Sequence, residues 1–207
     1  MKRFCLVLFC VALLGNTASS AAVFEGDWKT PGDGLLTYDN VNRREWLDLT
    51  ETQLFKFPGI TLEDRYQAVL SETMPGGQFT GFIAVSNPSD IRLFGESAGI
   101  DTSTLANPMN QVPATNLINL LGASVTGNYP ESLGMLDGID GRTGERGNMR
   151  VLNEGQNAGM LFGLGLDSRA GVWLYRQVPE PSAYLLFGMA FVAKFVFHCR
   201  SCRNLVP

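Results

Sequence analysis

The sequence predicts an α+β fold, in which one compact domain of short antiparallel strands and about three helices spans residues 23–177. Strand patterns come first along the chain, then helix patterns, then strands again, an order that favours α+β over a doubly wound sheet. After residue 127, short apolar stretches alternate with glycines, as in antiparallel hairpins. The length of 207 residues suits one domain with an appendage at each end.

The domain is expected to open with a loop and two short strands. Residues 25–34 are polar and rich in glycine, which predicts the loop. Residues 35–38 and 43–49 predict the strands, which the turn Asp39-Asn40 joins.

A helix is predicted over residues 61–73. Thr61 and Asp64 form a capping box at its start, apolar residues recur at helical spacing, and Pro75-Gly76-Gly77 ends it. Residues 78–85 are rich in Phe, Ile and Val and predict a buried strand.

Two more helices are expected in the middle of the domain. Asn87 is a cap residue and Pro88 suits the first helical position, so a helix should begin there and stop at Gly99. A third helix is predicted over residues 115–121, closed by Gly122. The rest of the domain predicts strands over residues 133–136, 149–152, 160–166 and 172–176.

The first 22 residues have the organisation of a secretory signal peptide. Lys2 and Arg3 form a basic start, residues 4–14 are an unbroken apolar run, and Ser20-Ala21-Ala22 supplies small residues for cleavage. The apolar run is shorter than the roughly 20 residues that span a bilayer. The alternatives are a buried N-terminal helix or a membrane anchor.

Composition excludes several classes of function for the domain. Residues 23–178 contain 19 acidic and 11 basic residues, a net charge of −8, which makes nucleic acid an improbable partner. The same residues include no Cys and no His, since the four cysteines are Cys5, Cys10, Cys199 and Cys202. Ser-His-Asp triads, Cys-His pairs and the usual zinc sites are therefore excluded. We expect no catalytic residue, metal or cofactor.

Two glycine-rich motifs invite a functional interpretation. Residues 137–145 have the acids and glycines of a calcium loop, but not the EF-hand spacing, so a hairpin loop is favoured. Residues 159–165 lack the Gly-Lys-Ser/Thr ending of a phosphate loop, which favours a Gly-rich strand.

Two sets of side chains could act on polysaccharide. Glu45, Asp48 and Glu51 could in principle pair as glycosidase carboxylates, although acids so close in sequence more often form a solvated face. Tryptophans stack on sugars but more often belong to the core in a domain of this size. The three tryptophans are Trp28, Trp46 and Trp173.

The last part of the chain predicts an exposed spacer and a membrane helix. Pro179 and Pro181 prevent their neighbours from continuing a strand or helix. Residues 183–193 are wholly apolar, and Lys194 then interrupts before residues 195–197 resume. The basic residues Arg200 and Arg203 leave the tail in the cytoplasm and residues 23–178 outside. The alternatives are an ordinary single-span anchor or a buried amphipathic helix.

This tail resembles the PEP-CTERM protein-sorting signal of Gram-negative bacteria. The resemblance is carried by a motif, an apolar helix and a basic end: Val178, Pro179, Glu180, Pro181 and Ser182, then Lys194, Arg200 and Arg203. It implies recognition by an exosortase, a membrane cysteine protease, with processing near the motif and export to the surface or to an exopolysaccharide matrix such as a biofilm. The departures are Lys194 within the span and the pair Cys199 and Cys202 after it, whose CxxC spacing is weak evidence of metal or redox chemistry.

The body of the domain is similar to the DUF1566-type, lectin-like domains of bacterial surface proteins. The similarity is carried by residues 34–38 and 45–50, the helix that contains Tyr66, residues 81–82, the helix over residues 86–94, and residues 171–176. It implies a compact α+β fold and glycan contact, and no catalytic residue carries over.

We therefore expect an exported, non-enzymatic surface or matrix protein that could bind exopolysaccharide. Its partners would be the Sec and signal peptidase machinery, the membrane through an inner-membrane-anchored intermediate, and an exosortase. The alternatives are a carboxylate-dependent polysaccharide hydrolase and a permanently anchored exported protein.

Overall fold

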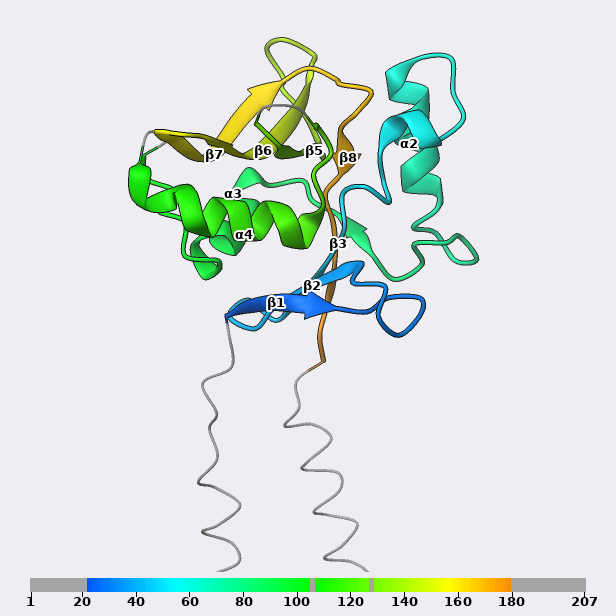
Figure 1. Cartoon of the computed structure of the whole chain (residues 1–207). Coiled ribbons are helices and arrows are strands. Elements are labelled where there is room, and N and C mark those ends of the chain that lie inside the picture. Colours follow the sequence, from blue (N-terminus) through cyan, green and yellow to red (C-terminus); the bar gives the residue numbers. More distant parts are fainter. Residues whose placement is uncertain (1–21, 105–106, 127–128, 180–207) are drawn as a thin grey trace, which may run out of the picture. The chain divides into compact units, whose positions relative to one another are not determined.

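The computed structural model describes residues 22–104, 107–126 and 129–179 (Figure 1). These residues form mostly antiparallel strands and three α-helices, in agreement with the expected α+β domain. Within the described residues, no helix is long and apolar enough to span a membrane. The expected signal helix over residues 1–22 and transmembrane helix after residue 182 lie outside the described part, apart from Ala22.

Nine described strands form two sheets. The first sheet has the order β1-β2-β3-β9-β4, and the second has the order β7-β6-β5-β8. The strands of the first sheet are β1 (Val23–Gly26), β2 (Leu36–Asp39), β3 (Arg44–Leu47), β4 (Ile83–Ala84) and β9 (Leu174–Gln177). Those of the second are β5 (Glu131–Ile139), β6 (Arg146–Glu154), β7 (Asn157–Leu164) and β8 (Gly171–Val172).

The α-helices begin and end largely where their caps predict. They are α2 (Leu62–Ser71), α3 (Pro88–Ser97) and α4 (Gln111–Leu121), with 3-10 turns η1 (Leu54–Lys56) and η2 (Pro108–Asn110). The capping box is present: Asp64 N–H donates to Thr61 Oγ1 (3.1 Å), and Thr61 N–H donates to Asp64 Oδ2 (2.8 Å). Asn87 caps α3 by accepting from Ser89 N–H.

Helix α4 starts four residues before the predicted start at residue 115. Pro113 lies in its first turn, where the missing N–H has no helical acceptor to lose. The helix stops before Gly122, whose φ of 73° is accessible to glycine at little cost.

Two predictions for the first sheet are wrong. Residues 78–82 form turns, and only Ile83–Ala84 is a strand. Phe79 and Phe82 are buried in the core from these turns, so their apolar side chains do not mark a strand. The loop predicted from residue 25 begins instead as the end of β1. Strand β1 pairs antiparallel with β2, and Phe24 stacks on Tyr38 at 5.1 Å. Its side chains are largely exposed, so the sequence lacks the alternation that marks a half-buried strand.

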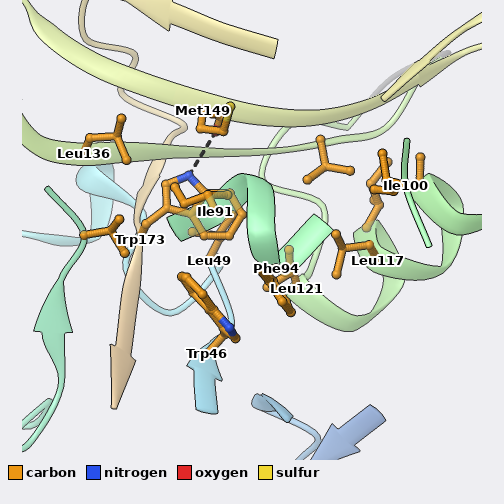
Figure 2. Close-up of a cluster of buried hydrophobic side chains, with 14 of the residues drawn as sticks. Trp46, Leu49, Ile91, Phe94, Ile100, Leu117, Leu121, Leu136, Met149 and Trp173 are labelled. Carbon is orange, nitrogen blue, oxygen red and sulfur yellow. Dashed lines mark hydrogen bonds between the residues drawn. The ribbon is translucent and has the colours of Figure 1, made fainter. Parts of the chain in front are cut away.

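The strand predicted over residues 172–176 is two strands in different sheets. Strand β8 pairs parallel with β5, whereas β9 joins the first sheet, and Trp173 lies between them. Trp173 is fully buried, and its indole N–H donates to Met149 O at 3.0 Å (Figure 2). The chain therefore crosses from one sheet to the other through this residue.

A cluster of buried side chains surrounds this crossing, and we call it the tryptophan core. Trp46 stacks on Phe94 of α3, with their ring centres 4.5 Å apart. It also meets Trp173 edge to face, with their ring centres 6.0 Å apart. Such aromatic pairs add about 0.5–1.5 kcal/mol each to the burial of their area. Its other labelled members in Figure 2 are Leu49, Ile91, Ile100, Leu117, Leu121, Leu136 and Met149.

Substitution of Gly134 by Ala should destabilise the protein. A Cβ at this position would lie 2.6 Å from Trp173 Cδ1, so the indole would have to move within a closely packed core. We expect the free energy of unfolding to fall by about 1–3 kcal/mol, measured by urea unfolding. The control is Gly141→Ala, because a Cβ there would meet nothing within 4 Å. Equal effects of the two substitutions would contradict this account of the core.

Candidate functional site

Strand β9 leads directly into the expected processing motif. Strand β9 lies between β3 and β4 within the first sheet, not at its edge. Tyr175 packs on Trp46 at 5.3 Å, and the Arg44 guanidinium lies 4.4 Å from the Tyr175 ring centre. The residues immediately before the motif are therefore an integral part of the domain.

Arg176 anchors the end of this strand. Its guanidinium forms an ion pair with Glu45 of β3 and lies 5.0 Å from the centre of the Phe82 ring. Glu45 is buried, and Tyr38 stands opposite it in the neighbouring strand. Burial, and then the Glu45 charge, raise the pKa of Tyr38, so this phenol stays neutral. The positive partner of Glu45 is Arg176.

The strand ends at Gln177, and the motif begins directly after it. Val178 is half-buried and Pro179 is exposed. Pro179 has no N–H with which to extend the ladder. Cys199 and Cys202 lie outside the described residues. So do the remaining predicted site residues, which are Glu180, Pro181, Ser182, Lys194, Arg200 and Arg203.

The three carboxylates considered for glycoside hydrolysis each have a separate partner. Glu45 binds Arg176, and Asp48 accepts from both the N–H and the Oγ1–H of Thr50 at 2.7 Å. Burial raises the pKa of Asp48. Glu51 lies 3.4 Å from Lys29 Nζ and is also near Lys56. Each of the three carboxylates therefore serves a local turn or an ion pair of its own.

Two of the three tryptophans are core residues and cannot stack on a sugar. Trp46 and Trp173 are both fully buried. Trp28 is half-buried, stacks on Phe79 at 5.6 Å, and carries Lys29 Nζ 3.9 Å from its ring centre.

The two glycine-rich motifs are hairpin elements, as the sequence favoured. Residues 140–145 form the turn between β5 and β6, where Asp140 Oδ1 accepts from Arg142 N–H and Thr143 N–H. These bonds lower the pKa of Asp140. Residues 159–164 belong to β7. Across the described ranges, no three acidic, His or Cys side chains are grouped as a metal site.

No local sequence pattern predicts the polar cluster around Arg146. Its side chain is 4% exposed, and Nη2 lies 2.6 Å from Glu63 Oε1 and Nη1 lies 3.5 Å from Asp137 Oδ1. The guanidinium also covers the Tyr66 ring at 3.7 Å, and Tyr66 donates to Asp137. The contacts join α2 to the β5–β6 hairpin across 83 residues of sequence, a separation that no local pattern records.

The Glu63–Arg146 pair should make stability depend on acid pH. The hydrogen bond from Arg146 lowers the pKa of Glu63 below its ordinary 4.5, so its contribution is complete above pH 4.5 and is lost as the pH falls below that value. Because Glu63 is half exposed, we expect about 1 kcal/mol or less. Glu63→Gln should flatten the loss of stability between pH 5 and pH 3, measured by urea unfolding, relative to the exposed control Glu154→Gln. An unchanged slope in Glu63→Gln would contradict the prediction.

Removing the Arg176 side chain should loosen strand β9. Arg176→Ala leaves the buried Glu45 carboxylate without its cation, a change that costs about 1–3 kcal/mol. Hydrogen exchange of the amides of Leu174–Gln177 should therefore become faster. Arg169→Ala is the matched control, since Arg169 is exposed and its ion pair with Asp167 is local. Equally fast exchange in both variants would show that the Glu45 contact does not hold the strand.

A family comparison identifies the segment that follows β9. Residues 177–201 match the PEP-CTERM protein-sorting motif. No curated protein and no solved structure matches the chain. The match begins at the last residue of β9 and includes all five residues of the expected processing motif. The chain therefore carries a PEP-CTERM sorting motif, which supports an exported, surface-directed protein that an exosortase sorts.

Proposed function

We propose that the chain is a non-enzymatic protein of the cell surface or extracellular matrix. In this proposal the domain up to Gln177 is delivered, and the tail from Val178 is an address that an exosortase removes. One observation carries it: the sorting motif begins at the residue where the last strand ends.

The position of the motif makes processing compatible with the fold. Cleavage near Pro179 to Pro181 would remove no residue of β8 or β9, and both Trp173 and the Arg176–Glu45 pair would stay in place. The delivered domain would keep both sheets. Figure 1 places the start of β1 and the end of β9 on the same side of the domain.

The chemistry of the domain supports a role without catalysis. Residues 23–178 contain no His and no Cys. The carboxylates that a hydrolase would need are bound by Arg176, Thr50 and two lysines. Among the tryptophans, Trp28 is the one that is not fully buried, so it is the position at which we propose contact with matrix polysaccharide.

Processing should depend on the motif and on the protease. We expect the variant Pro179→Ala/Glu180→Ala/Pro181→Ala to accumulate with its tail in the inner-membrane fraction, whereas Ile60→Ala, at a residue 98% exposed in the domain, is processed like wild type. The measurements are the intact mass and the cell fraction of the protein, in strains with and without the exosortase. An intact tail in the membrane fraction of both strains would make residues 178–203 a permanent anchor and refute the proposal.

A further inference from the structure

Strand β7 is the open edge of the second sheet, and only β6 pairs with it among the described residues. Gly165 N–H donates to Arg146 O at 2.9 Å, which sets the phase of the antiparallel ladder. In that phase, every second residue of β7 directs its backbone N–H and C=O away from β6. Asn110 Nδ2 donates to Ala158 O from the open side, in agreement with this phase.

The free part of the edge is short and well defined. Asn110 occupies the edge at Ala158. Beyond it, Met160, Phe162 and Leu164 present outward backbone groups that have no partner among the described residues. The centre of this free stretch is Phe162.

The edge lacks the protection that exposed edges normally carry. Asn157–Leu164 contains no charged residue, no Pro and no bulge, and such edges readily pair with another strand. Leu161, Phe162 and Leu164 are 36–40% exposed. Because residues 23–178 carry a net charge of −8, two copies would repel each other over most surfaces, and this neutral strand is a place where they can approach.

We propose that two copies of this chain pair antiparallel through β7, about a two-fold axis at Phe162. This register places Phe162 opposite its copy and Met160 opposite Leu164, so all the free outward groups find partners. It also places Leu161 opposite Gly163, where the missing side chain leaves room for the leucine. The two second sheets then form one continuous eight-stranded sheet.

Cross-linking of the full chain in cells tests this register. Phe162→Cys places a thiol on the proposed axis, where paired Cα atoms lie about 5.5 Å apart, within the range for a disulfide. Residues 23–178 contain no other cysteine. Ile60→Cys, at a residue 98% exposed, and the wild type report cross-links that arise from collisions or from the chain's own four cysteines.

After treatment with an oxidant, we expect Phe162→Cys to give a band at about twice the monomer mass, severalfold stronger than in either control. The double variant Phe162→Cys/Leu161→Lys should lose it, because the two added charges meet at the interface while Leu161 itself is partly exposed in the monomer. Export of the double variant at the wild-type level shows that it folds.

Two results would overturn the proposal. A Phe162→Cys dimer no stronger than that of the controls would mean that β7 does not pair with a copy. A monomer in which the new thiol is linked to Cys199 or Cys202 would mean that the chain's own tail covers the edge. Both results are read in whichever cell fraction holds the protein, so failure of sorting does not imitate failure of pairing.

Discussion

The hydrogen-bonded burial of Trp173 is the interaction on which the rest of the structure depends. Its backbone N–H donates to Met135 of the second sheet, and its backbone C=O accepts from Val85 beside the first. Its indole N–H finds Met149 O, so the whole side chain is buried without an unpaired donor. The flat ring lies against Gly134, and any larger residue there would displace it.

This arrangement makes the last strands of the domain essential to its core. Strand β8 completes the second sheet and β9 lies within the first, so each sheet depends on one of these last two strands. Thr52 Oγ1 bonds both backbone groups of Val172, and Arg176 binds Glu45, which fixes the two strands on either side of Trp173. The sorting motif begins only after these contacts end, which separates the residues needed for folding from those needed for delivery.

The surface of the domain has both charged clusters and an uncharged sheet edge. One group of charged side chains is the cluster of Arg146 with Glu63, Asp137 and Tyr66, which joins α2 to the β5–β6 hairpin. Strand β7, in contrast, contains no charged residue, and its outward backbone groups face the open side of the sheet. Monomeric proteins usually blunt such an edge with charge or proline, and β7 carries neither.

The sequence by itself determined the features that depend on neighbouring residues. The caps of α2 and α3, the stop at Gly122 and the sorting motif after Gln177 depend on residues within a few positions of one another. The tertiary structure alone decided the pairing of β1, the turns at residues 78–82, the crossing at Trp173 and the Arg146 cluster. Each of these depends on partners distant in sequence: β1 is a strand because β2 lies beside it, and residues 171–177 form two strands because two sheets meet at Trp173.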